Sequence, residues 1–313
     1  MIRLDFDERD LRSLRVFCNV AEAGGFAAAE KLLHMSKASI SRHVREVEER
    51  LGVRLCERGP AGFRLTPEGE VALKLATGAL RSLERIRPEI DAVHGVLSGS
   101  LALGVVEHAL GHPDCKLPQS IAMLKRRAPN VQPRIEVMTF PELNQALREH
   151  RVDIAIRGRY PGDDEFDYLP LFSETHRIYG AIRKEGKEGK EGKEGKEGRG
   201  GRASRELPLV HRPHPYVDAV LAAGGYVRGP DAGGLEAIAL LVATGDYVGL
   251  LPTHYAQLIG KRYALRARRG SPSFQHTLCA VTDPTRPSTH RADLFLAILR
   301  EFHARSAGAL AAA

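Results

Sequence analysis

The stretch SKASISRHVREVEERL (residues 36–51) decides how the N-terminal part of this chain is interpreted. Ser36 is a typical helix N-cap, and Ile40, Val44, Val47 and Leu51 follow at spacings of four, three and four residues. This periodicity predicts a helix with one apolar face, which must pack against a core.

The opposite face of this helix carries small and basic residues. At about 100° per residue, Ala38, Arg42 and Arg45 lie opposite the apolar face. A helix enters the DNA major groove when its exposed N-terminal part is slim and carries hydrogen-bond donors. We therefore expect a DNA-binding surface on this helix, formed by Ser36, Lys37, Ala38, Ser39, Ser41, Arg42 and Arg45.

The flanking residues predict a winged helix-turn-helix. Apolar residues at helical spacing indicate a helix over residues 11–20, ended by Gly24-Gly25, and a short helix over residues 26–33. After Gly52, residues 54–57 and 63–65 are predicted strands on either side of a Gly-Pro-Ala-Gly turn. This hairpin would be a wing, with Arg58 and Arg64 at its flanks.

Residues 26–70, FAAAEKLLHMSKASISRHVREVEERLGVRLCERGPAGFRLTPEGE, resemble the winged helix-turn-helix of LysR-type transcriptional regulators. Three positions depart from the family pattern: Lys37 replaces a usual Gln, Glu30 a usual Ala and Cys56 a usual Phe. Lys favours guanine acceptors where Gln favours adenine, so Lys37 can alter base preference. Glu30 falls where two helices usually approach closely, and Cys56 removes core volume.

Length and composition suit a regulator of two or three domains. The 313 residues are 43% hydrophobic, and neither a run of 18 apolar residues nor an apolar signal core is present. We therefore expect a cytoplasmic protein that does not enter the membrane. The net charge of +7 is a weak argument for DNA, since residues 183–205 hold nine Lys or Arg and five Glu. The placement of the arginines is the stronger argument.

Catalytic and metal-binding motifs are absent from the sequence. Neither His-Glu-x-x-His, Gly-x-Ser-x-Gly nor Gly-x-Gly-x-x-Gly after a strand occurs, and the 13 histidines are scattered. We expect no catalytic residues, no metal ligands and no cofactor. Cys18, Cys56, Cys115 and Cys279 share no metal-ligand spacing, which leaves buried free thiols or a redox switch.

A long helix is predicted over residues 67–97. Thr66 is its cap, Pro67 its first residue, and an apolar heptad stripe runs through Ala76, Leu80, Leu83, Ile90, Val93 and Leu97. The stripe either packs on its own domain or pairs two subunits, and the resemblance implies pairing. Pro88 should kink or split the helix.

From residue 98 the pattern changes to alternating strands and helices. Predicted strands at residues 101–106, 135–138 and 152–156 enclose helices at 117–128 and 141–150, which indicates a parallel sheet. The remaining residues repeat this pattern less cleanly, with a helix at 235–243 and strands at 177–182, 208–211, 247–251 and 276–281. Two similar lobes account for both halves.

Residues 98–313 also resemble, more loosely, the effector domain of LysR-type regulators, which is two-lobed and similar to periplasmic solute-binding proteins. The resemblance places lobe I at about 98–162 and 271–313 and lobe II at about 163–270. The two crossings between lobes would then fall near residues 161–166 and 268–273. Residues 184–198 are five Lys-Glu-Gly repeats, which we expect to form a disordered surface loop.

Ligands of such sheets bind beyond the carboxyl ends of the strands. The residues that follow the first three predicted strands, with weaker candidates in the second lobe, form the expected effector site: Glu107, His108, Ala109, Thr139, Phe140, Arg157, Gly158, Tyr226 and Gly233. The family commonly has Ser or Thr near the position of Glu107, so this carboxylate disfavours a simple anionic effector unless His108 or Arg157 offsets it. Alternatively, Glu107 caps a helix.

The fold class predicted is therefore α/β, with a winged helix-turn-helix at residues 1–66, a linker helix at 67–97 and an effector domain at 98–313. The expected function is sequence-specific transcription regulation through operator DNA, controlled by a small-molecule effector. The expected assembly is a homodimer that builds a homotetramer, and RNA polymerase is a further candidate partner. Two alternatives remain: a metabolite-acting enzyme with an N-terminal assembly module, and a DNA-binding protein without a ligand.

Overall fold

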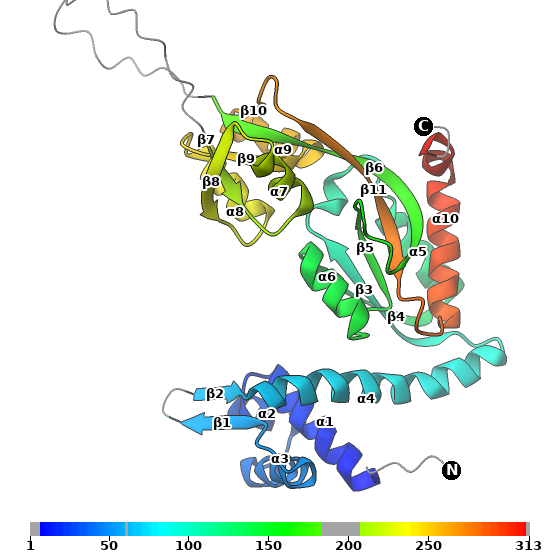
Figure 1. The fold of residues 1–313 in the computed structure, drawn as a ribbon. Coiled ribbons are helices and arrows are strands. Elements are labelled where there is room, and N and C mark those ends of the chain that lie inside the picture. The colour runs from blue at the N-terminus through cyan, green and yellow to red at the C-terminus, as the bar shows by residue number, and fades with distance from the viewer. Residues whose placement is uncertain (1–6, 60–61, 183–206, 311–313) are drawn as a thin grey trace, which may run out of the picture. The chain divides into compact units, whose positions relative to one another are not determined.

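The computed structural model describes residues 7–59, 62–182 and 207–310 (Figure 1). They form two compact units. The first comprises the chain up to Gly99 together with Arg148–Val152, and the second comprises Ser100–Leu147 and the chain from Asp153 onward. The Lys-Glu-Gly repeats, expected to be a disordered loop, lie outside the described residues.

The first unit has the predicted order of elements. Its elements are α1 (Glu8–Glu22), α2 (Phe26–Leu33), α3 (Lys37–Leu51), β1 (Cys56–Gly59), β2 (Gly62–Leu65) and α4 (Pro67–Val93). The caps explain where α3 starts and stops. The Ser36 hydroxyl accepts the N–H of Ser39 at 3.2 Å, and Gly52 ends the helix in the left-handed conformation at φ +69°.

One core holds this unit together. Phe17, Val20, Ile40 and Val44 are fully buried among the residues that α1, α2, α3 and the start of α4 contribute. Leu51, which we expected to be buried with them, is 38% exposed. That expectation is wrong because Leu51 is the last residue of α3, where the helix has passed the edge of the core.

Only the N-terminal part of helix α4 packs into the core of the first unit. Thr66 caps the helix and accepts the N–H of Gly69 at 3.0 Å, and Ala76 and Leu80 are buried in the core of the unit. The helix continues without interruption through Pro88, so the expectation of a split is wrong. An ion pair of 2.9 Å between Arg87 and Asp91 spans the proline and supports the turn that lost a backbone hydrogen bond.

The second unit is built on one mixed sheet. Its strand order is β4-β3-β5-β11-β6-β9-β7-β8, with β10 paired to β6. Strands β3 and β5 are parallel, as predicted for the first lobe, whereas β6 and β11 are antiparallel to each other. The strand bounds are β3 Ser98–Val106, β4 Asn130–Met138, β5 Ile154–Arg159, β6 Asp167–Ala181, β7 Leu207–His211, β8 Tyr226–Asp231, β9 Val248–Pro252, β10 Leu265–Ala267 and β11 Ser273–Thr282.

Two long strands join the lobes. The first half of β6 pairs with the part of β11 that also pairs with β5, while the second half of β6 pairs with β9 and β10. The crossings therefore lie inside β6 and β11. The expected crossing near residues 161–166 is wrong, and the one expected near residues 268–273 lies later in the chain, within β11. Lobe I is defined here as the side of β3, β4 and β5, and lobe II as the side of β7 to β10.

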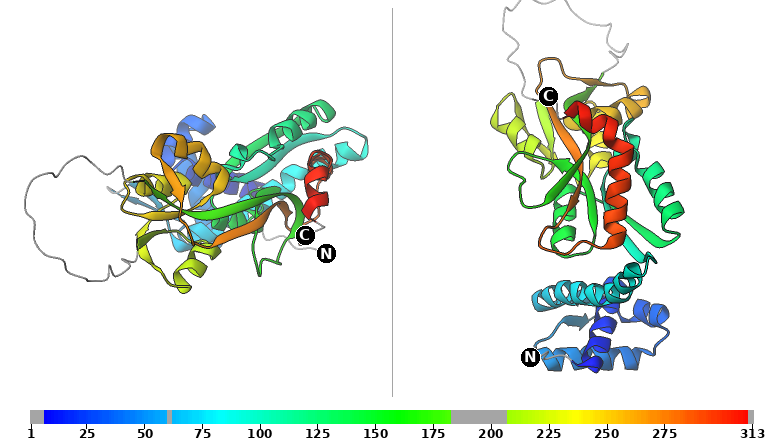
Figure 2. Two further views of the ribbon diagram at one scale, coloured as in Figure 1. Left: turned by 90° about the horizontal axis from the view of Figure 1, so that it is seen from above. Right: turned by 90° about the vertical axis from the view of Figure 1, so that its right-hand side faces the viewer.

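Helices cover the sheet in both lobes. Helices α5 and α10 contact each other against lobe I, as the side view shows (Figure 2). In lobe II, α8 and α9 pack against the sheet around Leu235, Ile238 and Tyr255. The helix bounds are η1 Ala109–Gly111, α5 Leu117–Arg127, α6 Phe140–Arg148, α7 Pro215–Ala222, α8 Leu235–Ala243, α9 Thr253–Tyr263 and α10 His290–Leu310.

Candidate DNA-binding and effector sites

Helix α3 presents the polar face that the sequence predicts. Its apolar side is closed, with Ile40 and Val44 fully buried and Val47 2% exposed. Of the predicted DNA-binding residues on this helix and its cap, five are exposed and two are partly buried. The exposed ones are Ser36, Lys37, Ala38, Arg42 and Arg45, and the partly buried ones are Ser39 and Ser41.

A buried polar cluster fixes α3 against α1. The Ser13 hydroxyl lies 2.9 Å from Nδ1 of His43, which is 6% exposed, and it donates to Glu46 at 2.9 Å. Arg9 donates to the other Glu46 oxygen at 2.6 Å. Arg42 lies 3.9 Å from Glu46, at the limit of an ion pair, and 68% of its side chain is exposed. Its guanidinium is therefore available to an external anion.

Glu30 has a definite role at the start of α3. Its carboxylate accepts the backbone N–H of Lys37 at 3.1 Å. The N–H groups of a helix's first turn lack partners within the helix, so this carboxylate adds to the cap formed by Ser36. Glu30 is itself exposed, so it does not disturb the contact between α2 and α3.

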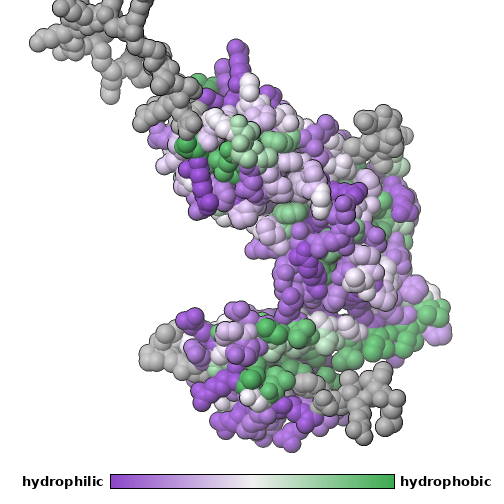
Figure 3. Space-filling view, in the orientation of Figure 1, coloured by the Kyte–Doolittle hydropathy of each residue, from purple (hydrophilic) through white to green (hydrophobic). Residues whose placement is uncertain are grey.

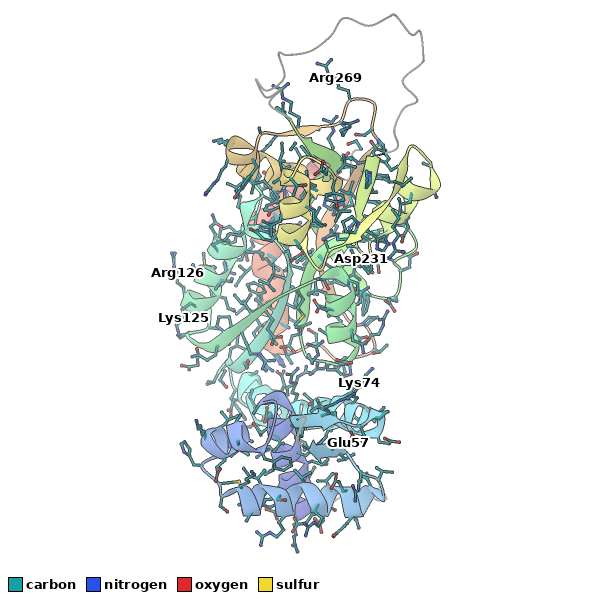
Figure 4. All side chains as sticks on the ribbon, turned by 90° about the vertical axis from the view of Figure 1, so that its left-hand side faces the viewer. Glu57, Lys74, Lys125, Arg126, Asp231 and Arg269 are labelled. Carbon is teal, nitrogen blue, oxygen red and sulfur yellow. The ribbon has the colours of Figure 1, made fainter. Side chains whose placement is uncertain are left out.

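The wing is a β-hairpin with four residues in each strand. Glu57 pairs with Arg64 in the ladder, and Arg58 pairs with Phe63. The wing is anchored to the body by Phe63, whose ring meets Phe26 edge-on at 5.9 Å. Arg64 is exposed on β2, and Glu57 is marked on the wing in Figure 4.

Two adjacent cavities lie in the second unit, between the carboxyl ends of the lobe I strands and lobe II. The larger has a volume of about 240 Å³ and is lined by Thr139, Phe140, Pro141, Glu142, Arg212, Pro213, His214, Ala232, Gly233 and Gly234. The smaller is about 20 Å³ and is lined by Val106, Glu107, Thr139, Phe140, Gly158, Tyr160, Glu174, His176, Arg212, His214, Leu235, Pro252, His276 and Leu278. Five predicted effector residues, Glu107, Thr139, Phe140, Gly158 and Gly233, therefore line a cavity.

Arg157 does not line either cavity. Successive residues of a strand point to opposite faces, so Gly158 borders the smaller cavity and Arg157 points away. The Arg157 side chain is fully buried and forms an ion pair with Asp163. It also donates to the hydroxyl of Tyr168 at 3.3 Å. The terminal nitrogens of Arg157 are thus held inside lobe I, and the structure does not bring this predicted effector residue to the cavities.

Three other predicted effector residues lie outside the cavity linings. His108 stacks on Tyr255 with ring centroids 3.9 Å apart, and Ala109 is buried at the start of η1. Tyr226 begins β8 and packs against the hydrophobic cluster around Val217. Each of these side chains is engaged in packing, which the position of a residue after a strand does not reveal.

Glu107 links the two lobes. Its carboxylate accepts the N–H of Leu235, the first residue of α8, at 3.1 Å and lies 3.8 Å from Arg212. Gly234 makes this approach possible, since a Cβ at that position would lie 2.5 Å from Glu107 Oε1. The alternative interpretation, in which Glu107 caps a helix, thus describes the observed geometry. The capped helix is α8, which belongs to lobe II.

The sequence interpretation missed a group of buried polar side chains beneath the cavities. Glu174, His176 and His276 are 6%, 2% and 7% exposed. Burial lowers the pKa of His176 to about 4, so its imidazole is neutral at pH 7. Burial alone would raise the pKa of Glu174, but the hydrogen bond from His176 and the proximity of His276 lower it by more, so the carboxylate is ionised. The alternation in Glu174-Thr175-His176 was the available signal.

The four cysteines are free and buried. Burial raises the pKa of the Cys18 thiol to about 11 and that of Cys279 to about 12. Since the thiolate is the reactive form, both are protonated and inert at neutral pH. The geometry favours the packing role over a redox switch.

In the described part of the chain, none of the helices combines the length and apolarity needed to cross a lipid bilayer.

A winged helix-turn-helix followed by a long helix and a two-lobed α/β unit with cavities between the lobes defines a DNA-binding regulator with a ligand domain. Comparison with known proteins agrees. Residues 11–70 match the bacterial regulatory helix-turn-helix proteins of the LysR family, and residues 94–183 match the LysR substrate binding domain.

Individual relatives point the same way. The HTH-type transcriptional activator BauR of Pseudomonas aeruginosa is 30% identical over 251 residues, 79% of this chain and 80% of that protein. The probable HTH-type transcriptional regulator LrrA of Synechococcus elongatus is 35% identical over 170 residues, 54% and 56% of the two chains. The fold resembles full-length CbnR in complex with its target DNA, with a TM-score of 0.57, 21% identity and coverage of 95% and 99%.

The chain belongs to the LysR family of DNA-binding transcriptional regulators. The predicted family, fold class and regulatory function are thereby confirmed. The alternative of an enzyme is wrong, because the relatives of this chain regulate transcription.

Proposed function

We propose that helix α3 enters the major groove of operator DNA and that the wing contacts the phosphates beside it. The observation that carries the proposal is the exposure of Ala38, Arg42 and Arg45 on one side of α3 while Ile40 and Val44 on the other are fully buried. Small residues let the helix approach the base edges, and arginines donate to guanine or phosphate. The proposed DNA contacts are Ser36, Lys37, Ala38, Ser39, Ser41, Arg42, Arg45, Arg58 and Arg64.

We infer that helix α4 pairs two copies of this chain. It carries large apolar side chains that are exposed along one stripe, and hydrophobic residues gather over α4 in the space-filling view (Figure 3). These residues are Val71, Leu75, Leu83, Ile86, Ile90 and Val93, which are between 44% and 75% exposed. Patches of this kind mark interaction surfaces, and paired recognition helices address two half-sites. Two such homodimers would form a homotetramer. We propose that this assembly binds DNA in the cytoplasm and that RNA polymerase is a further partner.

We further propose that a small-molecule effector occupies the larger cavity. Its volume of about 240 Å³ suits a small metabolite, since sites for drug-sized ligands span roughly 300–1,000 Å³. Phe140 and Pro213 supply apolar walls, Thr139 supplies a hydroxyl, and Arg212 supplies positive charge. A ligand that favours one arrangement of the lobes shifts the equilibrium between regulatory states.

The experiment begins with the duplexes that the purified protein selects from a genomic library. Fluorescence anisotropy across a salt series then compares wild type with Arg42→Ala. If Arg42 contacts a base, we expect the variant to lose about 1–3 kcal/mol of binding free energy. If it contacts a phosphate, the slope of log affinity against log salt concentration should be smaller by about one. The matched control is Arg126→Ala, which removes the same charge from the exposed surface of α5 (Figure 4). Wild-type binding by Arg42→Ala would refute the role of this face.

Ligand binding is tested separately with a metabolite panel. A ligand that binds the native state raises the unfolding temperature, because it stabilises by RT ln(1 + [L]/Kd). A stabilising metabolite should also change affinity for the selected duplex. If the whole panel changes neither quantity, the alternative of a ligand-independent DNA-binding protein is favoured.

A further inference from the structure

Three buried ligand-type side chains converge where the two long strands cross between the lobes. Glu174 and His176 are two residues apart on β6, so they share a face of the sheet. His276 on β11 is the ladder partner of Glu174. Side chains opposite each other in an antiparallel pair are close neighbours on one face. The backbone register thus brings all three side chains together.

The possible ligand atoms of the three side chains lie close enough together to surround one metal ion. His176 Nε2 lies 2.8 Å and His276 Nε2 lies 3.3 Å from Glu174 Oε2. One ligand atom from each residue can be chosen so that all three lie within 4.8 Å of one another. Ligands about 2.1 Å from a tetrahedral zinc ion are about 3.4 Å apart, so binding an ion would widen the 2.8 Å distance between His176 and Glu174 by about 0.6 Å.

Nε2 of His276, a possible metal-binding atom, is not occupied by a hydrogen bond. Its Nε2 is buried and makes no properly aligned hydrogen bond, despite its short distance to Glu174. The ring fits against the backbone of Gly158, where a Cβ would lie 2.7 Å from this Nε2. All three side chains also line the smaller cavity of about 20 Å³, which is enough for a single ion or water.

His254 and Arg212 lie close to this carboxylate, and Nδ1 of His254 has no hydrogen-bond partner there. His254 Nδ1 lies 3.5 Å from the other oxygen of Glu174, while its Nε2 lies 3.1 Å from the carbonyl of His108. The nearby positive charge of Arg212 would oppose a cation, but Arg212 is paired with Glu107 at 3.8 Å. The site therefore offers one carboxylate and two imidazoles.

We propose that Glu174, His176 and His276 bind one divalent first-row transition-metal ion of the zinc type, with a fourth coordination position open to the smaller cavity. Two imidazoles and a carboxylate suit such an ion, and three protein ligands leave room for water or a ligand group. The ion would tie β6 to β11, the strands that join the lobes. The proposal stands without the proposed effector, since metal binding is measured in the absence of DNA and metabolites.

The test uses full-length protein without a histidine tag, dialysed against a chelator and titrated with Co²⁺. We expect visible absorption of four-coordinate Co²⁺ that saturates at one ion per chain and disappears when Zn²⁺ is added. Glu174→Gln and His276→Gln should each weaken binding at least tenfold. The control His290→Gln changes an exposed histidine of the same unit and should bind as wild type does.

Two results would overturn the proposal. One is a wild-type titration without a saturable Co²⁺ signal at one ion per chain, a readout that does not depend on how any variant folds. The other is His276→Gln protein with native circular dichroism that binds Co²⁺ as tightly as wild type. Either result would leave the cluster as a set of packed polar side chains between β6 and β11.

Discussion

Glu107 of lobe I accepts the backbone N–H of Leu235 at 3.1 Å, so a carboxylate from one lobe occupies the N-terminus of helix α8 in the other. Helix N-termini favour negative charge because their N–H groups lack partners and the helix dipole is positive there. Glu107 thus fills, from within the chain, a position suited to an anionic ligand.

Replacing Glu107 should loosen this link. Glu107→Ala removes the acceptor from α8 and also the ion-pair partner of Arg212, so we expect a loss of at least about 0.5–2 kcal/mol of unfolding free energy, the magnitude of a lost cap. Glu107→Gln should lose less because its amide oxygen still accepts. Urea unfolding of both variants measures the effect, with Asp114→Ala, an exposed carboxylate of the same unit, as control. Equal stability of Glu107→Ala and wild type would show that the contact contributes nothing.

The buried pair of Arg157 and Asp163 predicts a larger effect. Arg157 has no exposed side-chain surface, so Asp163→Asn leaves its charge without a counter-ion. Breaking a buried pair in this way costs about 3–5 kcal/mol. The neighbouring Asp164 is 76% exposed in its ion pair with Arg159, so Asp164→Asn should remain near wild type in chemical denaturation. Similar losses for the two variants would contradict this account.

The same pair makes stability depend on pH. Burial alone would raise the pKa of Asp163, but hydrogen bonds from Arg157 and Tyr168 lower it below the ordinary value. The unfolded chain therefore holds this proton more tightly than the folded chain does. The stabilisation is present above about pH 4 and is lost as the pH falls through the folded pKa. The stability difference between wild type and Asp163→Asn should shrink below about pH 4, and a constant difference from pH 7 to pH 3 would argue against it.

Glu30 should support the start of the recognition helix. Its carboxylate accepts the N–H of Lys37 at 3.1 Å, so Glu30→Ala should lower the unfolding free energy by about 0.5–2 kcal/mol. Glu30→Gln keeps an acceptor and should lose less. Thermal unfolding is the measurement, with the exposed Glu22→Ala of α1 as control. If Glu30→Gln is as unstable as Glu30→Ala, charge rather than hydrogen bonding is the cause.

The apolar stripe of α4 predicts how the chain associates. Leu75 is 66% and Ile86 54% exposed, so Leu75→Asp and Ile86→Asp should each weaken self-association at least tenfold by placing a charge in the interface. Sedimentation velocity measures the change. Leu110→Asp, at a leucine that is 72% exposed outside this helix, should leave association unchanged. Association of Leu75→Asp at wild-type strength would exclude α4 as the pairing surface.

The sequence was sufficient for the DNA-binding unit because its signals are local. Ser36, the spacing of Ile40 and Val44, and Gly52 each act within one helix or its caps. The burial of Leu51 was predicted wrongly because periodicity does not show where along the helix the core ends. Helix α9 was not predicted between the strands at 247–251 and 276–281; it begins directly after Pro252, the last residue of β9.

The candidate sites of the second unit depend on long-range contacts and were harder to predict. Positions after strands identified Thr139 and Phe140 correctly as cavity-lining residues. The same rule failed for Arg157, since it does not give the face on which a side chain lies. The pairing of Glu174 with His276 joins residues about a hundred positions apart, and only the register of β6 with β11 brings them together.

The central claim is that the outward face of α3 contacts DNA bases, and directed cleavage tests it most directly. The four native cysteines are buried, so Ala38→Cys provides an exposed thiol for an iron chelate that cuts nearby DNA. We predict cleavage of the selected duplex at two places about one helical turn, or a multiple of it, apart. Leu110→Cys carrying the same chelate should not give this pattern. Absence of localised cleavage from position 38 on DNA that the protein still binds would contradict the account.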